Sequence, residues 1–475
     1  EELYDQAYIE KFTENWEAEK QHLAQFTPEA MSEICGISPE QLRRTARTFA
    51  AGKAGMIFWG MGVSQHIHGT DNSRCLISLA LMTGNVGKPG AGLHPLRGQN
   101  NVQGSCDMGS FPHELPGYQH VSIPEVRARF QQAWGVEIDD EPGLRIPNMF
   151  DAAIEGSFKG LYVQGEDIAQ SDPNTQHVQA ALGSLECLIV QDIFLNETAK
   201  YAHVLLPGST FLEKNGTFTN AERRINRVRK VMPPLPGKED WEITQELSNA
   251  LGYPMNYAHP SEIMDEIASL TPTFSGVNYD KLDQMGSIQW PCNDEHPVGM
   301  PIMHVEDFPI GKGHFAVTEY VATEERSNRR FPLLLTTGRI LSQYNVGAQT
   351  RRTDNQVWHD EDVLELHPHD AEERGVSNGD WLGITSRAGD TVMRAVISER
   401  MQPGVVYTTF HHPGSGANVI TTDNSDWATN CPEYKVTAVQ VEKVSQPSNW
   451  QQRHQAFDKQ QLDLLKRAKT LAEQP

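Results

Sequence analysis

Short apolar runs that end at glycine or polar residues, with helical stretches between them, restrict the fold of this 475-residue chain more than any other feature. The first run, residues 56–59, ends at a glycine-rich turn and precedes a helical stretch at 76–81. The pattern recurs in three further runs, at 160–164, 187–192 and 204–207. Runs this apolar, separated by helices, are typical of parallel strands that are buried on both faces of a sheet. The sequence therefore predicts an α/β fold with Rossmann-like parallel-sheet layers.

Polar side chains follow two of these predicted strands. Gly165, Glu166 and Asp167 come directly after the first, and Gln191 and Asp192 end the second. Open parallel sheets bind their ligands beyond the carboxyl ends of the strands. This edge of the sheet is therefore predicted to bind a ligand.

The predicted secondary structure changes near residue 306. Turns such as Asn378-Gly379 and Ala388-Gly389 then separate short strands, which are predicted at 333–335, 381–385, 391–398, 405–410 and 435–441. Many short strands joined by such turns indicate a β-rich domain, and we expect a barrel. The polar tail from about 450 places Phe457 and Leu462 at helical spacing, which predicts a helix that docks on the rest of the chain.

The charge of the chain limits its partners. Lys and Arg number 40 and Asp and Glu number 62, so the formal net charge is −22. Such a surface disfavours nucleic acid and anionic membranes, and an anionic ligand needs a local cluster of basic groups. No apolar run approaches the roughly 20 residues of a membrane span, so we expect a soluble chain without a membrane span.

The six cysteines contain no CxxC pair, so this chain alone cannot form a compact zinc or iron–sulfur site. Isolated thiols are typical of a reducing compartment, and the first residues do not resemble a secretory signal. We therefore expect a cytoplasmic protein. Because the first residue is Glu1 rather than Met, we expect the chain to begin inside a longer gene product or to be one part of a split one.

The stretch 94–104 is the most unusual in the sequence, since it places one arginine, two glutamines and two asparagines between glycines. Glycines let a backbone approach a ligand, amides satisfy fixed polar atoms, and the fork of Arg97 matches a carboxylate. A site for a small carboxylate is one reading. A glycine-rich connector with an exposed arginine is the other.

Three other motifs are less specific. Residues 83–92 contain Gly87-Lys88 but lack the spacing of a phosphate-binding loop, and Pro89 replaces the required hydroxyl residue. A basic run could cradle phosphates or neutralise a subunit interface, and consists of Arg223, Arg224, Arg227, Arg229 and Lys230. Three histidine pairs lack a third ligand at fixed spacing, so no metal site is assigned to His66 and His68, His367 and His369, or His411 and His412.

Taken together, several segments resemble the catalytic (alpha) subunit of molybdenum- or tungsten-dependent formate dehydrogenases. The resemblance covers essentially the whole chain, and residues 97–104 are its most specific part. The matching segments are 60–65, 83–87, 97–104, 165–167, 190–192, 213–220, 222–224, 337–339 and 432–435, with the region around Asn418.

The resemblance implies a fold and a cofactor. Parallel-sheet layers would be followed by a C-terminal double-psi β-barrel, and a bis-(molybdopterin guanine dinucleotide) cofactor with molybdenum or tungsten would lie between them. The implied domains are 1–99, the rest of an α/β domain carrying the substrate arginine; 100–305, an α/β dinucleotide-binding domain; and 306–475, the barrel with its terminal helix.

The resemblance also implies roles for individual residues. Arg97 would hold the carboxylate of formate beside the metal, and Gln99 and Gly98 would line the same pocket. The cofactor would contact two groups of residues. One group comes from the α/β part, namely Met61, Gly62, Gln65, Gly165, Glu166, Asp167, Gln191, Asp192 and Asp240. The other closes from the barrel, namely Arg339, Tyr344, Asn418, Tyr434 and Lys435.

The sequence departs from this family in one respect. Family members carry an iron–sulfur cysteine motif and a metal-ligating Cys or selenocysteine followed by His, all upstream of the segment matched here, and this sequence has neither. We therefore expect another polypeptide segment to supply these groups, including any [4Fe-4S] cluster. Electrons would leave through iron–sulfur partners and electron-transfer subunits, possibly of the NAD/flavin type, and the chain alone would be inactive.

Two alternatives remain at this point. The chain could serve another molybdopterin oxidoreductase, such as a nitrate reductase or a formyl-carrier dehydrogenase, or it could be a metal-free structural subunit of an electron-transfer complex. A different substrate would not require the pair Arg97 and Gln99. A structural subunit would not require the polar residues at the strand ends.

Overall fold

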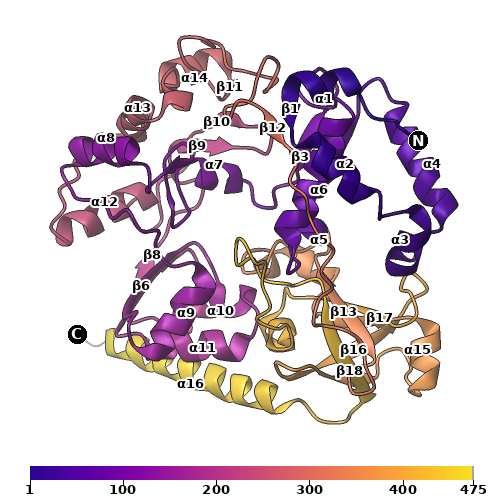
Figure 1. Ribbon diagram of the computed structural model, residues 1–475. Helices are drawn as coiled ribbons and strands as arrows, with labels where there is room; N and C mark the ends of the chain where they lie inside the picture. Colours follow the sequence, from indigo (N-terminus) through magenta and orange to yellow (C-terminus); the bar gives the residue numbers. More distant parts are fainter. Residues whose placement is uncertain (473–475) are drawn as a thin grey trace.

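The computed structural model describes residues 1–472, and residues 473–475 at the end of the predicted third domain lie outside the described residues. The described part has four separate hydrophobic cores. In Figure 1 the barrel lies beside a parallel α/β unit, and the N-terminal helices and a helix-rich unit lie across from them. The predicted combination of parallel sheets and a C-terminal barrel is confirmed.

The first parallel α/β unit is a three-stranded sheet in the order β6 (Gly160–Gln164), β7 (Cys187–Asp192) and β8 (Val204–Pro207). All pairings in it are parallel. Its core includes Leu188 of β7 and Leu182 of the helix between β6 and β7, and both are almost fully buried. Burying one such side chain stabilises the fold by roughly 1.5–3 kcal/mol. The helices of this unit are α9 (Ile146–Glu155), α10 (Ile168–Ser171) and α11 (Thr175–Ser184).

A second parallel sheet contains only two strands among the described residues, β2 (Met56–Trp59) and β3 (Gly92–Pro95). The predicted strand has the predicted bounds, but the expectation that it is buried on both faces is wrong. Met56 is 45% exposed and Phe58 is 58% exposed. The physical reason is that α6 (Gly69–Met82) contacts β3, whereas the described chain leaves the side of β2 that carries Met56 and Phe58 open.

The C-terminal part closes into a barrel, as predicted, with its strands in the order β13-β17-β14-β16-β15-β18. Alternate side chains such as Leu335, Leu364 and Val439 are buried inside it. Strand β14 was missed by the sequence reading because its four residues follow the acidic stretch 360–362. The strands are β13 (Leu333–Gly338), β14 (Val363–Leu366), β15 (Trp381–Thr385), β16 (Asp390–Ile397), β17 (Val405–Thr409) and β18 (Thr437–Lys443). The short helix α15 (Pro368–Glu373) follows β14.

Two helix-rich regions complete the fold. The N-terminal one packs Ile9 and Trp16 against Phe315 and includes α1 (Gln6–Phe12), α2 (Trp16–Leu23), α3 (Pro28–Cys35) and α4 (Pro39–Ala50). Ser38 caps α4, where it accepts a hydrogen bond from the backbone N–H of Gln41. The other region surrounds the antiparallel sheet β9 (Gly216–Thr219), β10 (Arg224–Val228) and β11 (Ser287–Gln289). Its helices are α7 (Val102–Asp107), α8 (Pro124–Trp134), α12 (Asp240–Ala250), α13 (Pro260–Leu270) and α14 (Tyr279–Met285).

The predicted docking helix is α16 (Asn449–Ala472), which runs beneath the α/β unit toward the barrel (Figure 1). Gln451 donates to the carbonyls of Val392 and Gly414 of the barrel part. Asp458 pairs with Lys200 of the α/β unit. The helix therefore ties the two units together, and its docking is confirmed.

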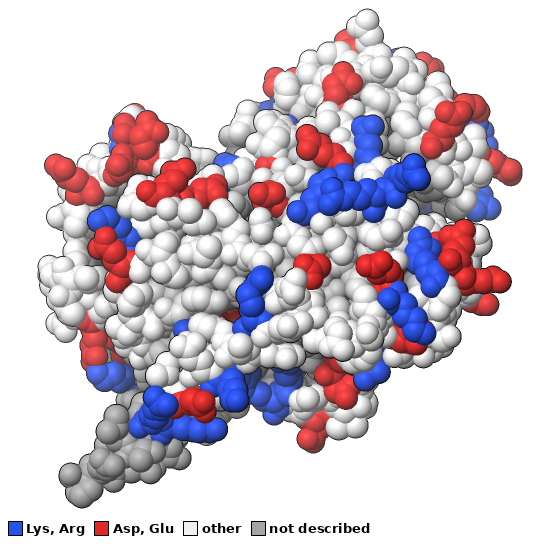
Figure 2. Space-filling view, turned by 90° about the horizontal axis from the view of Figure 1, so that it is seen from below, with Lys and Arg blue, Asp and Glu red and all other residues white. Residues whose placement is uncertain are grey.

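The face seen from below carries both signs of charge (Figure 2). Acidic and basic side chains alternate around its rim, and its centre is largely uncharged. Of the helices in residues 1–472, none has both the length and the hydrophobicity to cross a bilayer.

Candidate functional site

The predicted site residues come from four parts of the chain, and the structure brings several of them together at the junction of the α/β unit and the barrel. Arg339 of the barrel contacts Met61 of α5 (Met61–Ser64), with 3.4 Å between Nη1 and Sδ. The backbone N–H of Asn100, three residues after Arg97, donates to the hydroxyl of Tyr344 at 3.1 Å. Tyr434 donates to the carbonyl of Ser171 at the end of α10. Residues more than 200 positions apart in sequence therefore share one junction.

Asn418 of the barrel part holds α10 in place. Its amide nitrogen donates to the carbonyls of Gln170 and Ser171 at 2.9 and 3.0 Å. Gln170 in turn donates to the carbonyls of Val346 and Phe410. Because α10 leads directly from the carboxyl end of β6, these bonds fix that strand end against the barrel.

Two basic groups of the barrel side meet there without a carboxylate partner. Among the described residues, neither Arg339 nor Lys435 forms an ion pair. Arg339 donates to Asn345 and Lys435 donates to the carbonyl of Thr337. Burial is the main cause that lowers the pKa of Arg339, and burial together with Arg339 lowers the pKa of Lys435 to about 8. Two close, partly desolvated cations of this kind attract an anion.

Acidic groups lie near Tyr434 at the same junction. The side chain of Glu166 is exposed, and desolvation is the main cause that raises its pKa. Asp172 is buried, and desolvation together with Glu166 raises its pKa to about 7. Sequence reasoning missed Asp172, although it stands five residues after the predicted Asp167. Carboxyl groups in a recess can accept hydrogen bonds from the N–H groups of a base or a hydroxyl.

The other predicted acidic and amide residues are held by the chain itself. Both carboxylate oxygens of Asp167 accept bonds, from Thr198 and from the N–H of Glu197. Those of Asp192 accept bonds from Asn196 and two backbone N–H groups. These two carboxylates therefore shape the loop after β7, and direct contact with a ligand stays a prediction for both.

Gln191 and Asp240 lie side by side at the end of β7. The side-chain amide of Gln191 donates to Asp240 at 2.8 Å, and its side-chain carbonyl accepts a hydrogen bond from the hydroxyl of Tyr162. Asp240 also accepts from the N–H of Ser209 and pairs with Lys214. The backbone turn at Gly165 has φ +67°, a conformation that favours glycine, and its N–H donates to the carbonyl of Gln191. The structure thus places Gly165, Gln191 and Asp240 at one strand edge.

The Arg97 segment lies between β3 and α7, and Arg97, Gly98 and Gln99 are all exposed. The guanidinium has no carboxylate partner among residues 1–472, and its Nη1 lies 3.7 Å from Sγ of Cys106. Gly62 is exposed and Gln65 partly buried at the other end of this region. The fork of Arg97 is therefore available to a carboxylate.

A buried network supports this segment from behind, and sequence reasoning missed it. Asp107 is fully buried and accepts hydrogen bonds from Gln103, Tyr118 and Trp290. Desolvation is the main cause that raises its pKa. These bonds anchor α7, which begins five residues after Arg97. In the sequence, the cluster of amide side chains before Asp107 is the signal that could have revealed this network.

The basic run 223–230 is largely paired within its own unit. Arg223 donates to the carbonyls of Trp290, Met300 and Pro301, and its burial lowers its pKa. Arg227 and Arg229 both pair with Asp283, and Lys230 pairs with Glu239. The run therefore neutralises acidic and carbonyl groups within its own unit.

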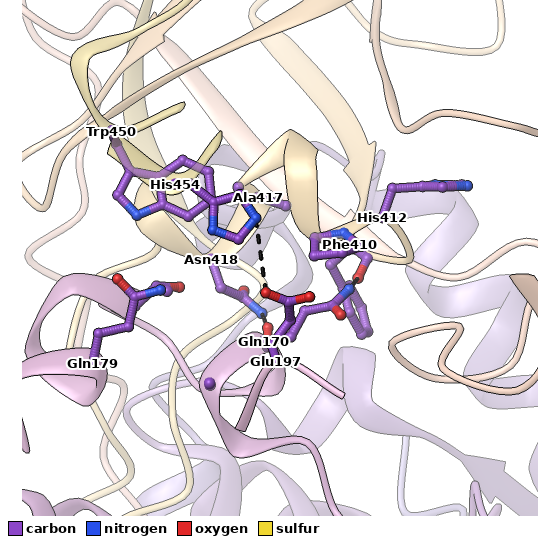
Figure 3. A pocket seen from close by; sticks show the side chains of 13 residues that line it. Gln170, Gln179, Glu197, Phe410, His412, Ala417, Asn418, Trp450 and His454 are labelled. Atoms are coloured by element: carbon purple, nitrogen blue, oxygen red, sulfur yellow. Dashed lines mark hydrogen bonds and ion pairs between the residues drawn. The ribbon is translucent and has the colours of Figure 1, made fainter. Parts of the chain in front are cut away.

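Two cavities lie away from the Arg97 segment. Figure 3 shows a cavity of about 20 Å³ between α10, α11 and α16, in which His454 faces Glu197. It has room for a water molecule and borders Asn418. A larger cavity of about 410 Å³ lies between α2, α6 and the segment 318–323, with Glu19, His66 and Glu433 in its wall.

The donor set at the junction fits a dinucleotide cofactor. Arg339 and Lys435 offer unpaired positive charge for phosphates, and Glu166 and Asp172 offer acceptors for base or ribose donors. Among residues 1–472, one group of side chains that could ligate a metal borders this junction, namely Glu197, His454 and Asp458.

Comparisons with known proteins agree with this geometry. The family described as "Molybdopterin oxidoreductase" matches residues 7–250, and the "Molydopterin dinucleotide binding domain" matches residues 333–438. Among solved structures, acetylene hydratase from Pelobacter acetylenicus has the same fold with a TM-score of 0.72 and 16% identity, over 93% of this chain and 68% of that one.

Two curated relatives are formate dehydrogenases. The F420-dependent formate dehydrogenase subunit alpha of Methanocaldococcus jannaschii is 41% identical over 94% of this chain and 66% of its own length. Formate dehydrogenase H of Escherichia coli is 38% identical over 94% of this chain and 63% of its own length. The chain thus spans somewhat less than two thirds of the relatives it matches. Since the first family match covers more than half of the chain, this protein belongs to the molybdopterin oxidoreductase family and carries a molybdopterin dinucleotide-binding domain.

Proposed function

We propose that this chain is the substrate-binding and cofactor-binding part of a formate dehydrogenase. It would oxidise formate to CO₂, or run the reverse reaction, when a polypeptide with the Cys or selenocysteine–His and iron–sulfur motifs completes it. The observation that carries the proposal is the unpaired, exposed Arg97 in a segment supported by the Asp107 network. The names of the relatives support the choice of formate as substrate.

The residues of this chain would perform three tasks. Arg97 would bind both oxygens of formate through its planar fork, and Gln99 would add a hydrogen bond, which together fix the direction of the formate C–H bond. Arg339 and Lys435 would hold the phosphates of a bis-(molybdopterin guanine dinucleotide) cofactor, with Glu166 and Asp172 toward its guanine or ribose groups. When bound, the cofactor with its molybdenum or tungsten supplies the two-electron redox chemistry. Oxidation of formate releases CO₂, one proton and two electrons, and the electrons would pass to iron–sulfur partners.

The remaining predicted contacts belong to the same proposal. Met61, Gly62 and Gln65 would border a pterin from the N-terminal part, and Tyr344, Asn418 and Tyr434 would border it from the barrel. Gly165, Asp167, Gln191, Asp192 and Asp240 would form the edge that receives a guanine dinucleotide. We place the boundaries of the three domains near residues 99 and 305.

The test uses the native assembly that contains this chain. Arg97→Ala should lower formate-dependent dye reduction at least 10³-fold, because one bidentate charged contact at the reacting centre is lost, while metal content stays unchanged. Arg97→Lys should also be strongly impaired, since lysine lacks the planar fork. Arg329→Ala, at an exposed arginine of the segment before the barrel, is the matched control and should retain activity.

Two results would count against the proposal. Formate turnover that survives Arg97→Ala would remove the assigned role of Arg97. An assembly that turns over another substrate, such as nitrate, but not formate would assign the chain to another oxidoreductase of the family.

A further inference from the structure

One face of the β2–β3 sheet is largely uncovered in the described residues. Parallel sheets are normally covered on both faces, and an isolated two-stranded sheet is marginally stable. Here Met56 and Phe58 leave one face of β2 about half exposed, and Leu96, directly after β3, is 58% exposed. Each strand also has one edge without a partner strand in residues 1–472. The face therefore offers both apolar surface and unpaired backbone groups.

This face is continuous with the Arg97 segment. The ladder between the strands extends one step beyond β3, because the N–H of Leu96 donates to the carbonyl of Trp59 at 2.7 Å. Arg97 is the next residue. Whatever packs on β2 and β3 is therefore brought beside Arg97.

We propose that the β2–β3 face docks the polypeptide segment that corresponds to the part of the relatives this chain does not span. That segment would add at least one strand to the sheet and cover Met56, Phe58 and Leu96 with apolar side chains. The missing length supports this occupant, because the chain spans only 66% and 63% of the two relatives described above. The inference rests on the proposed function, which requires a second segment to bring the metal-ligating motif next to Arg97.

The first test is a photo-crosslink from the face itself. A benzophenone amino acid replaces Phe58 in the native assembly, and mass spectrometry identifies the crosslinked peptide. The proposal expects a crosslink to the segment that carries the Cys or selenocysteine–His motif, whether that segment is separate or joined to this chain. A crosslink to a second copy of this chain, to an electron-transfer subunit, or to nothing would overturn it.

The second test is a pair of matched charge insertions. Phe58→Glu should lower the amount of the motif-carrying segment that co-purifies at least tenfold, or, where the segment is joined to this chain, should make it at least tenfold more sensitive to limited proteolysis. Leu235→Glu, at a 94% exposed leucine in the loop before α12, should change neither. Circular dichroism of both variants checks that the chain is folded, and Phe58→Leu, which keeps the face apolar, should retain docking.

Failure of this inference is distinguishable from failure of the proposed function. If the crosslink forms but the assembly does not oxidise formate, the docking face stands and the function is wrong. If the assembly oxidises formate but Phe58→Glu leaves docking unchanged, the function stands and the docking face is wrong.

Discussion

Two of the parallel sheets in the described residues, β6–β8 and β2–β3, start from the same sequence pattern and differ in how far they are covered. β7, the central strand of β6–β8, is covered by helices and held against the barrel, so Leu188 is buried completely. The predicted burial on both faces is wrong for the edge strand β8, where Val204 and Leu205 are each 43% exposed. β2–β3 has the same strand–turn–helix pattern, yet Phe58 is 58% exposed. The difference shows that the centre of the β6–β8 sheet is covered within residues 1–472, whereas one face of β2–β3 is left open in the same residues.

The largest expected effect separates the two sheets directly. Leu188→Asp places a carboxylate in a dry core and should lower the free energy of unfolding by more than about 4 kcal/mol, which prevents folding of the β6–β8 unit. Phe58→Asp in the isolated chain should cost less than about 1 kcal/mol, because the side chain already meets water. Urea denaturation of both variants checks this, and equal losses would remove the distinction between the sheets.

The next effect concerns α16, the helix that contacts both the barrel and the α/β unit. Trp450 of α16 is 4% exposed and lies against Gly416. Trp450→Ala should lower the free energy of unfolding by roughly 3 kcal/mol, since a large aromatic side chain leaves a cavity. It should also speed proteolytic cleavage between β18 and α16. Unchanged cleavage would show that α16 is not held by this contact.

A smaller effect on stability depends on pH and is expected from Asp172. Because burial raises the pKa of Asp172 from 3.8 to about 7, the native state binds more protons than the unfolded state between these values. The stability of the chain without cofactor should therefore fall as pH rises through this window and stay lowered above it. Asp172→Asn should be more stable than the parent by about 1–3 kcal/mol at pH 8 and similar at pH 4.

Urea denaturation across this pH range measures the effect of Asp172→Asn. Glu222→Gln serves as the comparison, because its carboxylate is exposed and paired with Arg224. A parent and an Asp172→Asn variant with parallel pH profiles would show that Asp172 does not titrate in this window.

The smallest effect concerns the N-terminal cap of α4. Ser38 accepts a bond from the N–H of Gln41 at the start of α4. Ser38→Ala should cost about 1 kcal/mol and should increase hydrogen exchange in the first turn of α4. An unchanged exchange rate at Gln41 would mean that α4 is held by packing alone.

Local patterns predicted local structure well. The apolar run 56–59 predicted the bounds of β2, and the polar tail from about 450 predicted the helix α16. The polar residues at 165–167 and 191–192 predicted that these strand ends lie at one edge, where the N–H of Gly165 donates to the carbonyl of Gln191. These outcomes depend on residues close in sequence, or on the general rule that parallel strands end at one edge.

Features that depend on distant neighbours were not predictable in the same way. Whether Phe58 is buried depends on what covers β2, and the strand itself cannot show this. The partners of Arg227 and Arg229 lie at Asp283, more than 50 residues away, so a basic run looked unpaired in sequence. The raised pKa of Asp172 arises where α10 meets the barrel.

One measurement tests the central claim most directly, namely metal and nucleotide analysis of the purified native assembly that contains this chain. The account predicts molybdenum or tungsten together with about two guanine nucleotides per copy of the chain, since a bis-dinucleotide cofactor carries two. An intact assembly that contains neither metal nor guanine nucleotide would contradict it, and would identify the chain as a structural subunit.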